Sequence, residues 1–276
     1  MIKLSVNVNK IALIRNSRAG NYPDVLAYAR RCIELGADGI TVHPRPDRRH
    51  IRANDVTALA ALMPEYPAIE LNIEGNPFAS AHSDYPGLMA FVEQVRPAQC
   101  TLVPDSDSQL TSDHGFNLQR DGERLRPIIQ HLHAQGCRVS LFMDANCAQI
   151  DLAKALCADA VEFYTGPYAQ ASAAHDEKQI NSELLALTLA ANRANVLGLR
   201  VNAGHDLNCL NLPALVRALP MLAEVSIGHA LTVDALEWGL ATSISAYQNA
   251  LLPTLDMSTH HANHRTQRCF HSLHFD

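Results

Sequence analysis

Residues Gly39–Ile51 read G-I-T-V-H-P-R-P-D-R-R-H-I and join a short apolar run to a basic loop. The run is rich in β-branched residues and ends at His43, and two prolines then interrupt regular structure. This pattern predicts a strand that leads into a cationic loop. The loop carries four arginines or histidines, at Arg45, Arg48, Arg49 and His50.

The same strand-like run recurs along the chain, and a stretch with helical periodicity follows most of the runs. The predicted strands are Lys3–Asn9, Gly39–His43, Ala68–Glu74, Gln99–Val103, Arg138–Asp144, Ala160–Tyr164, Leu199–Asn202 and Glu224–Ile227. The predicted helices include Pro23–Leu35, Asn54–Met63, Leu118–Ala134, Ser182–Ala194 and Asp234–Ala250. Repeated strand–helix units with no break in composition predict a single α/β domain, a (β/α)8 or TIM barrel over residues 1–252.

An open doubly wound sheet is the alternative fold. It ordinarily has fewer strands and a G-x-G-x-x-G turn after the first strand. The segment that follows the first predicted strand is N-K-I-A-L-I-R-N-S-R-A-G, which does not contain that turn. The barrel is therefore the preferred interpretation.

Composition excludes several classes of protein. The 276 residues are 47% hydrophobic and 18% charged, as expected for a soluble globular chain, and no apolar run reaches the length of roughly 20 residues that spans a bilayer. The N-terminus resembles a strand and not a signal peptide, so we expect a cytoplasmic protein without a membrane partner. The net charge of −6 argues against a nucleic-acid partner, although it permits a local basic pocket.

Cysteine spacing gives no indication of a disulfide framework or a zinc site. The seven cysteines are scattered, odd in number and never spaced C-x-x-C. The segment 253–276 contains five histidines and Cys269 but no strand or helix pattern that would fix their spacing. We interpret it as a tail that is disordered or binds metal adventitiously.

Several predicted strands alternate apolar and polar residues, which is unusual for a parallel sheet that is covered on both faces. Side chains two residues apart share a face, so the apolar set would pack under the helices and the polar set would point into the barrel. Buried polar groups are costly when unpaired, so this interior is either an interlocked network or a site open to a polar ligand. A ligand site explains more of the pattern, because the polar residues that close the strands lie where barrel enzymes place catalytic groups. These residues are Asn7, Asn9, His43, Glu74, Asp144, Glu162 and Asn202.

The strand ends and the loops after them carry candidate residues for proton transfer and phosphate binding. His43 suits proton transfer, and Glu74 in a cavity would have a raised pKa and serve as a base. Arg45, His50 and Arg18 are candidates for phosphate contacts, since a guanidinium binds phosphate oxygens in a bidentate manner. We expect Arg15 to be a solvated helix charge.

Three further expectations concern the remaining loops and the core. The long polar connection from Pro104 to Leu118 is a candidate lid. The pairs Gly204-His205 and Gly228-His229 follow the last two strands, the usual phosphate site of these barrels. Glu70 would lie deeper in the barrel and pair with Arg200.

Motifs at every predicted strand together resemble pyridoxine 5′-phosphate synthases, from about Leu4 to Leu251. The motifs are V-N-V-N-K-I-A, R-N-S-R, G-A-D-G-I-T-V-H-P-R-P-D-R-R-H-I, L-N-I-E-G, T-L-V-P-D, T-S-D-H-G, R-V-S-L-F-M-D, V-E-F-Y-T-G-P-Y-A, V-N-A-G-H-D-L and S-I-G-H-A. The resemblance implies an octameric (β/α)8 barrel that condenses 1-deoxy-D-xylulose 5-phosphate with 3-amino-2-oxopropyl phosphate, without a metal or an organic cofactor. The products would be pyridoxine 5′-phosphate, phosphate and water.

The resemblance also implies roles for individual residues. His43 and Glu74 match proton acceptors, His205 a proton donor, and Glu162 a carboxylate that stabilises the transition state. The implied substrate-binding residues are Asn7 for the amino-ketone phosphate, Arg18, Arg45, His50 and Thr111 for the deoxyxylulose phosphate, and Gly228 and His229 for the second phosphate. Lys10 and Asp206, which the resemblance does not supply, are further candidates for substrate contacts. Arg48 and Arg49 are interpreted as surface or interface charges.

The chain departs from the commonest pattern of these synthases at two places. Asn9-Lys10 replaces Asp-His in the first loop, and Asp206 replaces the second glycine of G-H-G. Lys10 keeps a positive charge for a phosphate. These departures motivate one alternative, a non-catalytic phosphate-ligand binder. Another is a sugar-phosphate aldolase or lyase, which would require a Schiff-base lysine inside the barrel, where no predicted strand supplies one.

Overall fold

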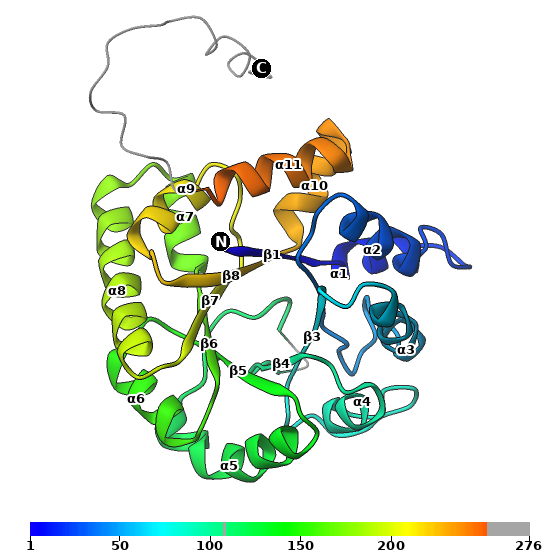
Figure 1. The fold of residues 1–276 in the computed structure, drawn as a ribbon, viewed down its shortest axis with the longest axis horizontal. Helices are drawn as coiled ribbons and strands as arrows, with labels where there is room; N and C mark the ends of the chain where they lie inside the picture. Colours follow the sequence, from blue (N-terminus) through cyan, green and yellow to red (C-terminus); the bar gives the residue numbers. More distant parts are fainter. Residues whose placement is uncertain (107–108, 253–276) are drawn as a thin grey trace, which may run out of the picture.

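The computed structural model of the protein describes residues 1–106 and 109–252. In this part of the chain eight parallel strands close into a barrel in sequence order, and helices surround it (Figure 1). The first and last strands pair through Leu4 and Val225, which closes the ring. The fold is thus the predicted (β/α)8 barrel.

The strands have bounds close to those predicted. They are β1 (Lys3–Asn7), β2 (Gly39–Val42), β3 (Glu70–Gly75), β4 (Gln99–Leu102), β5 (Arg138–Met143), β6 (Ala160–Tyr164), β7 (Arg200–Gly204) and β8 (Leu222–Ile227). The helices are α1 (Asn9–Asn16), α2 (Val25–Glu34), α3 (Ala53–Leu62), α4 (Leu88–Val95), α5 (Leu118–Ala134), α6 (Cys147–Ala155), α7 (Gly166–Ala173), α8 (Glu177–Val196), α9 (Leu212–Ala218), α10 (His229–Trp238) and α11 (Leu240–Ala250), with a 3₁₀ turn η1 (Met63–Glu65). The predicted histidine-rich tail, 253–276, lies outside the described residues.

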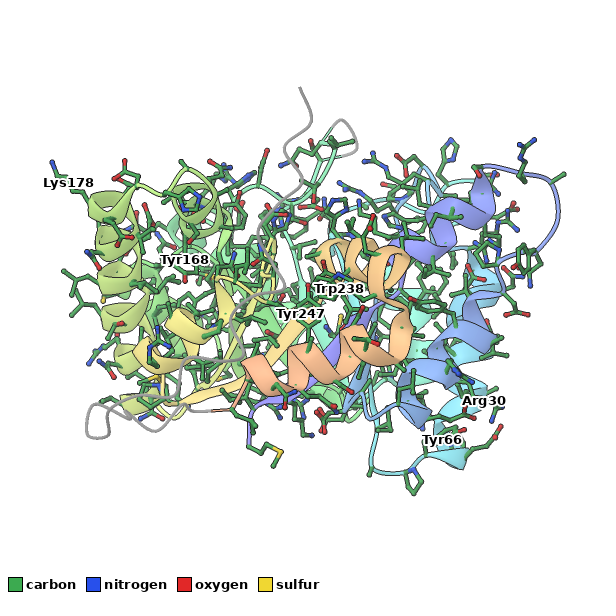
Figure 2. The ribbon with its side chains drawn as sticks, turned by 90° about the horizontal axis from the view of Figure 1, so that it is seen from above. Arg30, Tyr66, Tyr168, Lys178, Trp238 and Tyr247 are labelled. Atoms are coloured by element: carbon green, nitrogen blue, oxygen red, sulfur yellow. The ribbon has the colours of Figure 1, made fainter. Side chains whose placement is uncertain are left out.

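Two of the differences between predicted and observed elements have clear local causes. The first strand ends at Asn7 and not at Asn9, because the Asn7 side chain accepts a hydrogen bond from the Asn9 N–H (3.0 Å) and the chain turns into α1. The predicted helix Asp234–Ala250 is two helices, because Gly239 adopts a φ of 79° between α10 and α11. The Tyr247 hydroxyl donates to Asp234 (2.7 Å) and joins the two helices within the outer layer (Figure 2).

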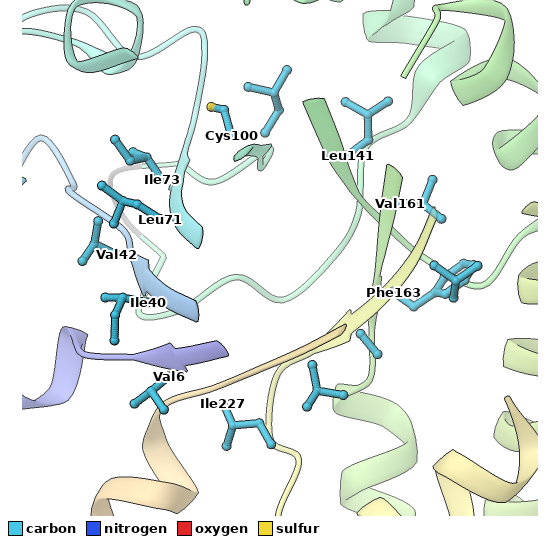
Figure 3. Packing of buried hydrophobic residues seen from close by; sticks show 14 of the residues in the cluster. Val6, Ile40, Val42, Leu71, Ile73, Cys100, Leu141, Val161, Phe163 and Ile227 are labelled. Carbon is cyan, nitrogen blue, oxygen red and sulfur yellow. The ribbon is translucent and has the colours of Figure 1, made fainter. Parts of the chain in front are cut away.

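The apolar set of the strands packs outward against the helices, as predicted. Figure 3 shows Val6, Ile40, Ile73 and Phe163 projecting away from the barrel axis, and all four are buried. Burial of each such side chain stabilises the fold by about 1.5–3 kcal/mol. This layer between sheet and helices is the hydrophobic core.

Part of the polar set forms a hydrogen-bond network inside the barrel. Ser5 and Thr41 hydroxyls are 2.7 Å apart, the Asn72 amide donates to Thr41 (3.4 Å), and the Thr101 hydroxyl donates to Asn72 (3.1 Å). A further bond runs from Thr101 to Glu162 (3.4 Å). The interior is therefore as polar as the alternation predicted, and the network extends up to the strand ends.

Two predicted charge interactions are wrong. Glu70 of β3 pairs with Lys3 of β1 (3.0 Å) and Arg138 of β5 (2.6 Å), because inward side chains of alternate strands meet in one layer of the barrel. Arg200 pairs instead with Glu224 on the neighbouring strand β8 (3.1 Å). Arg15 is fully buried and not solvated.

No helix within residues 1–106 and 109–252 has the length and apolar character needed to cross a membrane.

Candidate active site

A cavity of about 730 Å³ opens at the carboxyl ends of the strands. Twelve of the thirteen predicted site residues line it, from all sides of the barrel mouth. They are Asn7, Lys10, His43, Arg45, His50, Glu74, Thr111, Glu162, His205, Asp206, Gly228 and His229. Arg18 is exposed just beyond α1 and lies outside this lining.

His43 lies between two carboxyl groups at the end of β2. Its Nδ1 is 3.7 Å from Glu74 Oε2, and its Nε2 is 3.8 Å from Asp105 Oδ2. Burial, together with the positive charges of Arg45 and Arg49, holds the pKa of His43 well below its usual range. The imidazole is therefore neutral at physiological pH and able to accept a proton.

Glu74 and Glu162 are buried carboxyl groups with perturbed acidity. Burial raises the pKa of Glu74 well above its usual range, and the nearby charges of Glu162 and Asp105 add to the effect. Burial and the neighbouring Glu224 raise the pKa of Glu162 to about 8. A carboxyl group of this kind holds a proton near neutral pH and is a stronger base than a solvated one once it ionises.

The turn between β1 and α1 connects the first two strands of the site. The Asn7 amide reaches Glu74 Oε2 at 3.5 Å, and Asn9 Oδ1 accepts the backbone N–H of His43 (2.9 Å). Asn9 therefore fixes the backbone that carries His43. Lys10 follows at the N-terminus of α1 and adds a cation to the cavity.

The loop after β2 supplies the basic wall of the cavity. Arg45 is buried, lies 3.2 Å from Asp105 Oδ2 and donates to the carbonyl of Ser106 (3.2 Å). Burial together with Arg45 and Arg49 lowers the pKa of His50 to about 3. The Ile51 N–H donates to His50 Nδ1 (2.9 Å), so the neutral ring carries its proton on Nε2 and can donate to an anion.

Residues 109–112, from the connection between β4 and α5, line the cavity and are held by contacts on both sides. Arg49 donates to the carbonyls of Gln109 (2.9 Å) and Leu110 (2.8 Å). The Ser112 hydroxyl donates to Asp105 (2.8 Å), and the Thr111 hydroxyl lies 2.8 Å from His205 Nε2. Arg49 was predicted to be a surface charge and is instead a cavity residue, because the loop after β4 folds back onto it.

His205 follows β7 on the opposite side of the cavity from the basic wall. Its Nδ1 is 3.0 Å from Asp206 Oδ2, and its ring is 5.2 Å from that of Tyr164 in an edge-on arrangement. The preceding Gly204 leaves space for the Glu162 carboxyl group, since a Cβ at position 204 would be 2.4 Å from Glu162 Oε1.

The N-terminus of α10 provides a second place for an anion. Its first helical hydrogen bond runs from the Thr232 N–H to the Gly228 carbonyl (3.0 Å), so the preceding N–H groups point out of the helix end at the cavity. A Cβ at Gly228 would be 3.0 Å from both the Cβ and the carbonyl oxygen of Asn7, so glycine allows the close approach of this turn to β1. His229 begins the helix.

The prediction from sequence did not include Asp105 among the site residues. It follows β4 in the motif T-L-V-P-D, and a carboxylate so soon after a strand was a usable signal. Its burial raises its pKa, while Arg45 and Ser112 act in the opposite direction. Among residues 1–106 and 109–252, no group of three or more His, Cys, Asp or Glu side chains could hold a metal ion.

A barrel with buried acid–base groups at the strand ends, an arginine-rich wall and a helix N-terminus facing them defines an enzyme that performs proton transfer on anionic substrates. Residues 4–252 match the family described as "Pyridoxal phosphate biosynthesis protein PdxJ". The chain therefore belongs to the PdxJ family, the pyridoxine 5′-phosphate synthases of vitamin B6 biosynthesis.

Curated relatives support this placement. A pyridoxine 5′-phosphate synthase of Xanthomonas oryzae pv. oryzae (strain MAFF 311018) is 55% identical over 250 residues, which cover 91% of this chain and 96% of the relative. The synthase of Xylella fastidiosa (strain 9a5c) is 49% identical over 249 residues, 90% of this chain and 94% of the relative.

Solved structures of distant sequence share the fold. The BexX/CysO complex of Amycolatopsis orientalis aligns with a TM-score of 0.58 at 14% identity, covering 91% of this chain and 90% of the other. A D-psicose 3-epimerase of Clostridium cellulolyticum H10 aligns with a TM-score of 0.54 at 13% identity, covering 90% and 98%. At this identity they show the barrel alone.

Proposed function

We propose that the protein condenses 1-deoxy-D-xylulose 5-phosphate with 3-amino-2-oxopropyl phosphate to give pyridoxine 5′-phosphate, phosphate and water. The observation that carries the proposal is the pairing of neutral His43 with high-pKa carboxyl groups in one cavity that has cationic or N–H donors at both ends. Two phosphorylated substrates require two separate places where donors can bind a phosphate.

His43 and Glu74 are the proposed proton acceptors. Amine and ketone condense only when the amine is free, and ring closure requires removal of a proton from carbon. The depressed pKa of His43 leaves it neutral, and the raised pKa of Glu74 makes its ionised form a strong base, so the two groups can divide these steps. Asp105, 3.8 Å from His43, is positioned to orient the ring.

His205 is the proposed proton donor to leaving oxygen atoms, and Glu162 the proposed carboxylate that stabilises positive charge in the transition state. Glu162 lies deep in the cavity with a pKa of about 8, so it can be ionised when an iminium forms next to it. The distribution of groups with different acidity around one cavity suits a reaction with several proton transfers.

Phosphate binding is assigned to the two ends of the cavity. Arg45, His50 and Thr111 would hold the deoxyxylulose phosphate, since a buried guanidinium and an Nε2–H are both donors to an anion. Gly228 and His229 at the α10 N-terminus would hold the second phosphate, with Lys10 adding charge. Asn7 would contact the amino-ketone.

Arg18 and the oligomeric state are linked in the proposal. Arg18 is exposed and outside the cavity lining, so its contact with the deoxyxylulose phosphate requires either movement of its loop or the approach of another copy. We propose a homo-octamer by resemblance, and a variant branch of the family distinguished by Asn9-Lys10. Light scattering of the purified protein measures the assembly, and a monomer of full activity would contradict it.

Incubation of the purified protein with both phosphorylated substrates tests the function. Pyridoxine 5′-phosphate should appear by absorbance together with released phosphate, and neither substrate alone should give product. Binding of both substrates without turnover would instead identify a non-catalytic phosphate binder. Borohydride trapping of a substrate on Lys10 would favour aldolase chemistry.

A further inference from the structure

Two successive residues after β7 have a left-handed backbone conformation that residues other than glycine rarely adopt. His205 has a φ of 89° and Asp206 a φ of 57°. Left-handed conformations of residues other than glycine cost of order 1–3 kcal/mol each and persist only where their surroundings fix them. Contacts with the surrounding residues must therefore hold this turn, and its strain suggests that the conformation serves a function.

The residues that directly precede α7 and α9 hold this turn in place through hydrogen bonds. The fully buried Thr165 hydroxyl lies 2.8 Å from the Gly204 carbonyl and 2.6 Å from the His205 carbonyl, and donates to this pair. The Asn211 amide donates to the Asp206 carbonyl (3.1 Å), and the hydroxyl of the buried Tyr168, labelled in Figure 2, donates to the Asn211 carbonyl (2.7 Å).

The strained turn directs the Asp206 carboxylate onto its neighbour's ring. Asp206 Oδ2 lies 3.0 Å from His205 Nδ1, and on the other side of the ring the Thr111 hydroxyl lies 2.8 Å from Nε2. The contact with His205, with help from His229 and Lys10, keeps the pKa of Asp206 below its usual range. An ionised carboxylate only accepts hydrogen bonds, so Nδ1 carries a proton and Nε2 is the nitrogen that faces the cavity.

Direct contact between Asp206 and a substrate phosphate is chemically unfavourable, because two anions repel each other. The groups that face Asp206 are His205, Lys10 and His229, and Tyr164 also packs against the His205 ring. Its negative charge is thus directed at cations and at an imidazole, on the border of the second anion site.

We propose that Asp206 is a positioning residue whose carboxylate fixes the Nδ1–H tautomer and the orientation of His205. Nε2 first takes up a proton from the substrate or from solvent, and the Asp206 carboxylate stabilises the resulting imidazolium. His205 then gives that Nε2 proton to a leaving oxygen as the bond between this oxygen and carbon breaks. After this transfer, the ring is neutral with its proton on Nδ1. This inference rests on the proposed function of His205 as the proton donor, and it replaces the interpretation of Asp206 as a substrate contact.

Two substitutions distinguish the effect of the Asp206 carboxylate from that of the backbone conformation. Asp206→Asn keeps the size and tolerates a positive φ, whereas Asp206→Gly removes the side chain and adopts that φ without strain. Neither variant should lower the thermal midpoint, because asparagine tolerates the turn and glycine relieves its strain. Both should lower kcat at least about 10-fold and leave KM for each substrate within about threefold, because only proton transfer is impaired.

Glu93→Gln provides the matched control. Glu93 also pairs with a histidine, His131 (2.7 Å), but on the exposed surface between α4 and α5. This variant should match the wild-type protein in kcat and KM. Wild-type kcat in both Asp206 variants would refute the inference, and so would an increase in KM with kcat unchanged, which marks a substrate contact.

The tautomer can be measured without turnover. Nitrogen-15 shifts of His205, assigned by comparison with His205→Gln, should indicate a protonated Nδ1 in the wild-type protein and a loss of that preference in Asp206→Gly. A protonated Nε2 in the neutral wild-type ring would overturn the proposal. An enzyme that gives no pyridoxine phosphate but has the expected tautomer would refute the proposed function alone.

Discussion

Replacement of Arg15 by methionine should destabilise the protein strongly and loosen the loop that carries His50. Arg15 is fully buried in α1, its guanidinium binds Asp55 at the start of α3 (2.9 Å), and it donates to the His50 carbonyl (3.0 Å). Asp55 also accepts the Arg52 N–H (2.7 Å), so the pair joins α1, α3 and the basic wall.

The structure sets the size of the effect. Methionine fills the apolar path of the side chain but leaves the Asp55 carboxylate, which is 7% exposed, without its cation. Breaking a buried pair in this way costs about 3–5 kcal/mol, which for a chain of this size lowers the thermal midpoint by roughly 6–20 °C. Arg15→Met/Asp55→Asn should recover part of the loss, because asparagine carries no charge and still accepts the Arg52 N–H.

Circular dichroism melts and steady-state kinetics measure the two consequences. KM for 1-deoxy-D-xylulose 5-phosphate should rise more than kcat falls, since the loop with His50 binds and does not react. Arg30→Met is the control, because Arg30 pairs with Glu65 (2.6 Å) on the surface, where a pair has little effect. A midpoint for Arg15→Met equal to that of Arg30→Met would refute the reasoning.

Three other perturbations address the site directly. His43→Ala should lower kcat by about 10²–10⁴-fold while KM changes little, because a base is lost and the Arg45 contact remains; steady-state kinetics that show normal turnover would exclude His43 as the base. Gly204→Ala should lower kcat at least about 10-fold, since its Cβ would lie 2.4 Å from Glu162 Oε1 and displace that carboxyl, and retained kcat would show that its position is not critical. Glu162 ionises near 4.5 when unfolded but near 8 when folded, so its contribution to stability is complete below pH 4.5 and is lost as the pH rises to about 8. Melts of wild type and Glu162→Gln from pH 5 to 8 should therefore show the wild type losing stability relative to the variant, and a constant difference would contradict the raised pKa.

Local sequence was sufficient for the barrel and for the groups that end its strands. Alternation along β1 and β3 marked which side chains face inward, and Figure 3 shows the apolar partners, such as Val6 and Ile73, facing outward. His43 and Glu74 were found because a strand end fixes the direction of a side chain.

Sequence was insufficient where partners come from distant segments. Arg15 was interpreted as solvated because nothing in the sequence of α1 indicates that Asp55 lies against it. Arg49 was interpreted as a surface charge because its partners, the carbonyls of Gln109 and Leu110, are on another loop. The position of Asp105 soon after β4 could have marked it as a candidate, but only the fold shows that its carboxylate lies against Arg45.

The sequence by itself determined the fold, the family and the kinds of reactive group, because periodicity, strand ends and motifs are local properties of the chain. Tertiary structure alone decided how acidic those groups are and which atoms they present. The pKa of Glu162 depends on burial and on Glu224, and the orientation of His205 depends on a strained turn held by Thr165. The physical reason is that acidity and orientation depend on solvent exclusion and on neighbouring charges, which arise only when separate strands close into one barrel.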